Sequence, residues 1–282
     1  MKKIGILHPG QMGISVAATI VNSGYEVYWV SENRSQSTVE RAKSQKLMDL
    51  QNLKTMCNTC DVIISICPPH AAESVAMQVV NCSFCGLYLD CNAIAPQRAA
   101  LIGKSLSAAG IQFVDGGIIG GPAWTPGSTW LYLSGESAEA VVDLFHAGSL
   151  GTEVIGTEIG KASALKMCYA AYTKGSTALI SSILAASEGL NVREILETQW
   201  SRDWPGFVDR AYERTQRVTQ KAWRFEGEMT EIASTFEALG LPDGFHIAAS
   251  EIYSRLAQYK DLKELPALEE VLETLLTNIR LS

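Results

Sequence analysis

The chain has 282 residues, of which 47% are hydrophobic and 19% charged, enough to build one large or two moderate domains. Its formal net charge of −7 argues against nucleic-acid binding as its main function. No apolar run of about 18 residues occurs and no signal peptide precedes the first strand, so a soluble, cytoplasmic protein with no membrane partner is expected.

Strands and helices are predicted to alternate through the first half of the chain. Apolar segments typical of buried strands lie at residues 2–7, 26–30, 61–66, 86–90, 111–115 and 129–135. Segments with helical spacing or helix-stop signals lie at residues 11–22, 37–44, 70–80, 96–110 and 137–146. This alternation predicts an α/β fold with a doubly wound, mostly parallel sheet, as in Rossmann domains.

The second half of the chain has a different character. Residues 161–190 read as one long helix rich in Ala, Ser and Gly, and residues 191–282 show helical periodicity without a convincing strand. We therefore expect a Rossmann domain over residues 1–158 and an all-helical domain over residues 159–282, joined by the long helix. The helical domain is expected to bind substrate and to form a homodimer.

A glycine-containing turn follows the first strand. In the dinucleotide-binding pattern G-x-G-x-x-G, the glycines allow a tight turn, close approach of the pyrophosphate, and close packing of helix on strand. Gly10 and Gly13 fill the second and third positions, and His8 replaces the first. Free N–H groups at the helix start would face the phosphates. A nucleotide site is therefore favoured over a plain strand-to-helix turn, with cofactor contacts at His8, Pro9, Gly10, Gln11 and Met12.

The end of the second strand favours NADP over NAD. NAD enzymes usually carry Asp or Glu there, which binds the ribose 2′-hydroxyl, but this chain has Ser31. Arg34 lies close by and suits a 2′-phosphate, whereas Glu32 would repel that group unless it points away. NADP is therefore predicted, with NAD as the alternative. The residues expected to bind the ribose side are Ser31, Asn33, Arg34 and Ser35.

Two Cys-x-x-Cys pairs raise the question of a metal. Cys57 with Cys60 and Cys82 with Cys85 each come just before a strand, so parallel pairing of those strands would bring the pairs together. A good strand lies between the pairs, however, and zinc ribbons have little between their ligand pairs. Reduced thiols that pack as small hydrophobes are the favoured interpretation, and no metal is assigned.

The order of these motifs resembles the superfamily of β-hydroxyacid dehydrogenases and 6-phosphogluconate dehydrogenase, in particular a poorly characterised branch similar to the latter. The resemblance is carried by Ile4–Gly13, by Asp61–Pro68, by Asp90–Ala93 with Pro96, by Asp115–Gly121, and by Lys166 after Gly156 and Gly160. It implies cofactor contacts at Cys67, Pro68, Asn92 and Ala93. It also implies that Lys166 is the catalytic acid/base, in a site between the domains.

Three expected substrate groups of that superfamily are absent. Ile119 replaces a serine of the substrate loop, Ala170 replaces an asparagine, and a Lys-Asp pair falls near Gly227-Glu228, without its lysine. The resemblance therefore implies a substrate other than an ordinary short β-hydroxy acid.

Candidate substrate contacts are Ile119, Gly120, Gly121, Ala170 and Trp204. The two glycines would let a substrate approach backbone N–H groups, and Trp204 could form an apolar wall, although such tryptophans are more often core or interface residues.

Together these features predict an NADP-dependent oxidoreductase that transfers hydride between the nicotinamide and a carbonyl or hydroxyl of a small acidic molecule. Two alternatives stay open. One is an imine reductase on the same scaffold, whose members tend to replace the lysine kept here. The other is an NADP-binding sensor that has lost catalysis.

Overall fold

The computed structural model describes residues 2–260 and 262–277. The chain forms two compact units, Met1–Met167 and Cys168–Ser282. The expected domain boundary at residue 158 lies before the helix α7 (Lys161–Gly189), whose first residues the structure groups with the first unit. The reason is that the start of α7 is hydrogen-bonded to the sheet, as described below.

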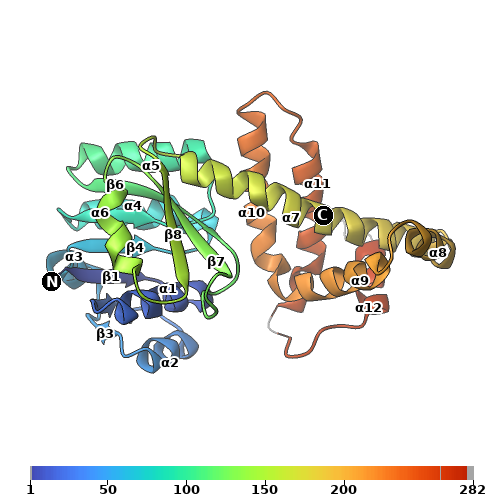
Figure 1. Ribbon diagram of the computed structural model, residues 1–282, viewed down its shortest axis with the longest axis horizontal. Coiled ribbons are helices and arrows are strands. Elements are labelled where there is room, and N and C mark those ends of the chain that lie inside the picture. Colours follow the sequence, from blue (N-terminus) through green and yellow to red (C-terminus); the bar gives the residue numbers. More distant parts are fainter. Residues whose placement is uncertain (1, 261, 278–282) are drawn as a thin grey trace. The chain divides into compact units, whose positions relative to one another are not determined.

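The first unit is built on an eight-stranded sheet in the order β3-β2-β1-β4-β5-β6-β7-β8. Neighbouring strands are parallel except β6 and β7, which are antiparallel, so the predicted mostly parallel sheet is confirmed (Figure 1). The strands are β1 (Lys3–Leu7), β2 (Glu26–Trp29), β3 (Met48–Asp49), β4 (Val62–Ser65), β5 (Leu87–Asp90), β6 (Gln112–Ile119), β7 (Thr129–Ser134) and β8 (Leu150–Gly156).

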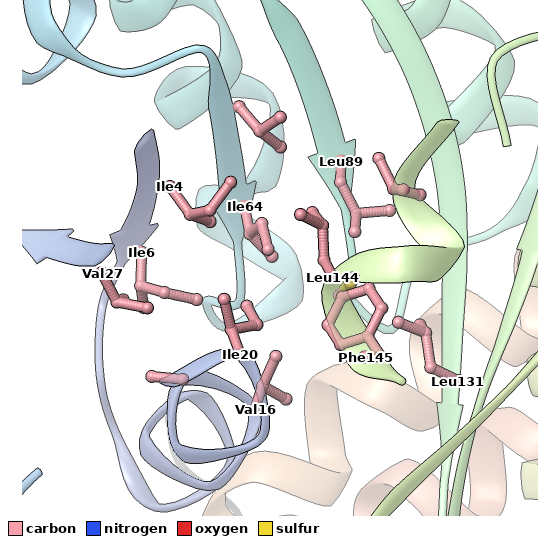
Figure 2. Packing of buried hydrophobic residues seen from close by; sticks show 14 of the residues in the cluster. Ile4, Ile6, Val16, Ile20, Val27, Ile64, Leu89, Leu131, Leu144 and Phe145 are labelled. Carbon is pink, nitrogen blue, oxygen red and sulfur yellow. The ribbon is translucent and has the colours of Figure 1, made fainter. Parts of the chain in front are cut away.

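Helices cover both faces of this sheet, because the buried strands alternate side chains between two apolar clusters. Ile6 and Ile64 point to the face covered by α1 (Gln11–Asn22), where Ile20 and Phe145 pack (Figure 2). That face also receives α2 (Gln36–Ser44), α6 (Glu139–Val142) and the 3₁₀ turn η2 (Asp143–Phe145). The opposite face receives α3 (Leu53–Thr59), the turn η1 (Pro69–Ala71), α4 (Ala72–Asn81) and α5 (Pro96–Ala108).

Several elements differ from the sequence-based expectation. The strand β3 is only two residues long, and β8 is an edge strand of partly exposed residues, so neither has the apolar pattern of a buried strand. The short helix α3 was also not expected. The helix expected over residues 137–146 forms as the short helix α6 followed directly by the 3₁₀ turn η2.

The second unit is helical throughout its described residues, as expected. It contains the later part of α7 together with α8 (Arg193–Asp203), α9 (Phe207–Val218), α10 (Ala222–Glu237), α11 (Gly244–Leu256) and α12 (Leu268–Leu276), with 3₁₀ turns η3 (Thr219–Lys221) and η4 (Ala257–Tyr259). Buried Met229, Ile232 and Tyr253 lie in its core, and the Tyr253 hydroxyl donates to the Lys174 carbonyl at 2.7 Å. None of the helices in the described part of the chain is long and apolar enough to span a membrane.

Candidate cofactor and catalytic site

The turn between β1 and α1 keeps the shape of a phosphate-binding turn although its first glycine is replaced. His8 has a φ of 68°, in the left-handed region that glycine adopts freely and that histidine tolerates better than most residues. The Gly10 N–H donates to the His8 carbonyl at 2.7 Å. Gly10 is the N-cap of α1 and brings no side-chain cap, so N–H groups at the helix start stay available for an anion.

His8 and Arg34 lie together beside this turn. Burial, and after it the nearby Arg34 cation, lowers the pKa of His8 to about 4, so its imidazole is neutral at pH 7. The Nδ1 atom of His8 and the Nε atom of Arg34 are both buried and have no hydrogen-bond partner. Buried polar atoms are normally paired, so these two mark a place where a polar ligand fits. The residues present therefore suit the phosphate groups of a dinucleotide.

The loop after β2 places the remaining residues expected at the ribose side. Asn33 takes a left-handed conformation with φ 59°, and Ser35 is the N-cap of α2, accepting from the Thr38 N–H at 3.4 Å. The Ser31 N–H donates to Asp49 Oδ1 at 3.2 Å. Asp49 had no role in the sequence analysis, because only pairing of β3 with β2 brings it to this loop.

A second polar cluster lies where β4 and β5 end, and Asn92 is its centre. The Cys67 N–H donates to Asn92 Oδ1 at 2.6 Å, and Asn92 Nδ2 donates to Ser65 Oγ at 3.1 Å. Asn92 thus ties the loop with Cys67 and Pro68 to the loop that contains Ala93. The four residues that the resemblance assigned to the cofactor are therefore brought together at the carboxyl edge of the sheet, where open α/β sheets bind ligands.

Asp90 lies beneath Asn92 and received no role from the sequence. Its Oδ1 accepts the Asn92 N–H at 2.8 Å, and its Oδ2 is buried without a partner. Burial raises the pKa of Asp90 to about 7, and the negative charge of Asp115 contributes in the same direction. Near neutral pH this buried carboxyl is consequently protonated in a large fraction of molecules.

The side chain of Lys166 is hydrogen-bonded to strand β6. It lies near the start of α7, and its ammonium donates a hydrogen bond to the carbonyl of Ile118. The helix lies so close to β6 that a Cβ atom on Gly117 would be 2.6 Å from the Ala162 carbonyl oxygen and 3.2 Å from Lys166 Cβ. Lys166 is therefore held where the carboxyl-terminal end of β6 leads into the expected substrate loop.

The expected substrate residues are divided between the two units. Ile119 is the last residue of β6, and Gly120 and Gly121 follow it as exposed residues, with Gly120 at a φ of 123°. Ala170 belongs to the second unit and is buried, and its contact with substrate stays a prediction. Trp204 also belongs to the second unit, where it is 54% exposed and packs on Phe207.

In the two cysteine pairs, Cys57, Cys60 and Cys82 pack in the apolar cluster on one face of the sheet, whereas Cys85 is exposed. Parallel pairing of β4 with β5 brings Cys57 to Cys82, with which it forms a hydrogen bond. Burial raises the pKa of Cys57 and of Cys60 to about 12, so both are protonated thiols at pH 7. Among the described residues, no three His, Cys, Asp or Glu side chains gather as a metal ion would need.

Comparison with known proteins identifies the family. Residues 3–147 match the NAD-binding domain of 6-phosphogluconate dehydrogenase. The chain belongs to this family of NAD-binding domains. Residues 188–256, in the helical unit, match a domain of unknown function, DUF1932. The expected superfamily is confirmed, and the first unit is an NAD(P)-binding domain.

Solved structures with a similar fold match nearly the whole chain. A conserved protein of unknown function, described as structurally similar to 3-hydroxyacid dehydrogenases, is 26% identical, with 91% of this chain and 98% of that chain covered and a TM-score of 0.66. The 3-hydroxyisobutyrate dehydrogenase of Mycobacterium tuberculosis, solved with L-serine, is 18% identical, with 98% and 100% covered and a TM-score of 0.72. A variant imine reductase of Myxococcus stipitatus, solved with NAD+, is 17% identical, with 98% and 100% covered and a TM-score of 0.57.

Gly13→Ala is expected to weaken dinucleotide binding by about tenfold or more, which corresponds to about 1.4 kcal/mol. A Cβ atom at this position would lie 2.6 Å from the His8 carbonyl oxygen, so the turn that presents the N–H groups must shift. Titration calorimetry with NADPH measures the loss. Gly244→Ala is the matched control, because a Cβ atom there has nothing within 4 Å. Equal affinity of the Gly13 variant and the wild type would contradict this role of the turn.

Proposed function

We propose that the protein is an NADP-dependent oxidoreductase that transfers hydride between the nicotinamide and a carbonyl or hydroxyl of a small acidic substrate. The observation that carries the proposal is Lys166, whose ammonium is fixed to β6 in an NAD(P)-binding domain that also holds the Asn92 cluster at its carboxyl edge. An ammonium group in a fixed position is what a carbonyl oxygen needs when it becomes an alkoxide.

In this mechanism a bound nicotinamide supplies or accepts the hydride. Lys166 donates the proton to the substrate oxygen during reduction and takes it back during oxidation. The Ile118 carbonyl holds the ammonium in place between these steps. Asn92 fixes the Cys67 loop and so shapes the edge of the sheet on which the cofactor is expected to rest.

Arg34 supports NADP as the cofactor. Its guanidinium is partly buried beside the phosphate turn. Burial disfavours the charged form and so lowers the pKa of Arg34, and a bound anion would stabilise that positive charge. Asp49 Oδ1 accepts hydrogen bonds from the backbone N–H groups of Ser31 and Gln51. Asp49 therefore orders the loop after β2, and we assign recognition of a 2′-phosphate to Arg34.

Arg34→Leu is expected to weaken NADPH binding by about 10- to 100-fold, because a charge-assisted hydrogen bond contributes about 1.5–3 kcal/mol. NADH, which lacks the 2′-phosphate, should bind the variant about as well as the wild type. Calorimetry with both coenzymes measures the two effects. Lys43→Gln removes an exposed cation from α2 and is the matched control. Equal losses for both coenzymes, or no loss for either, would reject NADP selection by Arg34.

A turnover screen with the preferred coenzyme then separates the reaction classes. Oxidation of small hydroxy acids or reduction of the matching carbonyl acids supports the proposal. Activity confined to cyclic imines supports imine reduction, which the absence of polar groups at Ile119 and Ala170 and the similarity to an imine reductase fold favour as the second candidate. Tight coenzyme binding without turnover on either panel supports a sensor.

We also propose that the helical unit forms a homodimer. The support is a set of large apolar side chains that are more than 70% exposed on three of its helices, Tyr172, Ile195 and Phe245.

A further inference from the structure

A buried carboxylate on β6 binds the start of α7. Asp115 is 1% exposed and lies in register between Asp90 on β5 and Ser134 on β7. Its Oδ2 accepts hydrogen bonds from Ser134 Oγ at 3.1 Å, the Gly160 N–H at 3.0 Å and the Ser163 N–H at 3.0 Å. Its Oδ1 accepts from Ser163 Oγ at 2.6 Å. Three of these four donors belong to the residues that begin α7.

The hydrogen bonds to Asp115 favour its ionised form. Burial raises the pKa of this carboxyl, and the hydrogen bonds from Ser163, Ser134 and Gly160 offset part of that rise. Three donors converge on Oδ2, and two of them are backbone N–H groups, which can only donate. A negative charge at the N-terminus of a long helix is also favourable for the helix dipole. Asp115 therefore acts as a charged cap supplied by the sheet.

Strand β6 binds the start of α7 through Asp115 and also binds the side chain of Lys166. Asp115 holds the backbone of the first turn of α7, and Ile118, three residues further along β6, accepts from the Lys166 ammonium. Between these two points Gly117 allows the helix to lie directly on the strand. The start of the helix that carries Lys166 and the lysine ammonium itself are thus both bonded to β6, as a preorganised proton donor requires.

We propose that Asp115 is a positioning residue for Lys166, which it holds at the Ile118 carbonyl by fixing the first turn of α7 on β6. This role rests on the proposed function of Lys166 as acid/base. Asp115 acts through the helix and needs no contact with substrate. The proposal predicts that loss of its charge loosens the lysine without changing the cofactor turn at His8, which lies on a different strand-to-helix connection.

Asp115→Asn tests the proposal because it keeps the shape and removes the charge. Its amide NH₂ can only be placed toward the Ser163 hydroxyl, which also accepts hydrogen bonds, so the Gly160 and Ser163 N–H groups then face a neutral oxygen and their bonds lose the strengthening from the carboxylate charge. We expect the Lys166 amine to react with methyl acetimidate about tenfold faster, as for the loss of a helix cap. Hydrogen exchange should rise over residues 160–166, and the NADPH dissociation constant should stay within about twofold. Peptide mass spectrometry reads the first two quantities.

Controls separate positioning from a general loss of structure. Asp143→Asn makes the same change at an exposed carboxylate, and Lys166 should react as in the wild type. Ser163→Ala removes one of the four bonds and should raise the Lys166 rate by a smaller factor. If Asp115→Asn does not fold, Ser163→Ala decides the question.

An unchanged Lys166 rate in a folded Asp115→Asn protein, or in Ser163→Ala where the first variant fails to fold, overturns the proposal. Faster exchange throughout the first unit, together with weaker NADPH binding, also overturns it, because that pattern is a purely structural role. These measurements need no substrate. A lysine that is positioned by Asp115 but dispensable for turnover would contradict the proposed function and leave the positioning result intact.

Discussion

Replacement of Lys166 by methionine is expected to lower hydride-transfer turnover by about 10²- to 10⁴-fold, the usual contribution of a general acid. Methionine retains an unbranched apolar stem but has no proton to give, so the substrate oxygen would develop its charge without a partner. The hydrogen bond to Ile118 is also lost. Coenzyme binding should change by less than about twofold, because the phosphate turn and the Asn92 cluster lie on other strands of the sheet.

The measurement is the single-turnover rate with saturating coenzyme, so that chemistry is separated from binding and product release. Lys161→Met is the matched control, since Lys161 is an exposed lysine at the first position of the same helix. Wild-type turnover in the Lys166 variant would show that another group supplies the proton. Loss of coenzyme affinity together with turnover would show instead that the lysine supports the binding site.

The cofactor turn keeps its backbone conformation although histidine replaces the first glycine of the pattern. The pattern G-x-G-x-x-G lacks its first glycine here, yet His8 adopts the left-handed conformation that this glycine would supply. Gly10 and Gly13 alone predict the turn from the sequence, and the structure adds the reason why His8 fits. What a single sequence could not provide was the neighbour of His8, since Arg34 reaches it only after the strands pair.

The elements that escaped prediction share weak local signals. The strand β8 has glycine at both ends of a partly exposed segment and is stabilised by pairing with β7 rather than by a buried apolar face. The long helix α7, in contrast, was predicted over its whole length because helical periodicity accumulates over many residues. Sequence periodicity therefore identified the buried parallel strands and the longer helices, and it failed for the edge strands created by pairing and for the short helix α3.

The candidate site divides in the same way. Residues on glycine-containing or family-like motifs, such as Lys166 and Asn92, were identified before the structure. Asp90 and Asp115 also lie in family-like motifs, but the sequence assigns them no role, because their roles depend on the cross-strand register that places them side by side. Ala170 and Trp204 were chosen by correspondence or by residue type. Ala170 is buried and Trp204 is half exposed, and substrate contact by either residue stays a prediction.

Asp90→Asn is expected to make the protein more stable than the wild type at neutral pH, by about 4 kcal/mol. Burial raises the pKa of Asp90 to about 7 in the folded protein, whereas an unfolded aspartate titrates near pH 4. Below about pH 4 both states hold the proton and the residue has no effect. Between about pH 4 and 7 the folded state binds more protons, so the wild-type free energy of unfolding falls as pH rises.

Urea unfolding of both proteins from pH 4.5 to pH 8 measures this effect as the difference between the two curves. The asparagine side chain can still accept the Asn92 N–H through its oxygen, so the local structure is expected to persist. The difference should grow by up to about 1.4 kcal/mol per pH unit and then level off above pH 7. Asp143→Asn, at an exposed carboxylate, should track the wild type. Parallel curves for Asp90→Asn and the wild type would mean that Asp90 is already ionised in the folded protein, and that the buried Asp90 and Asp115 carboxylates are both charged.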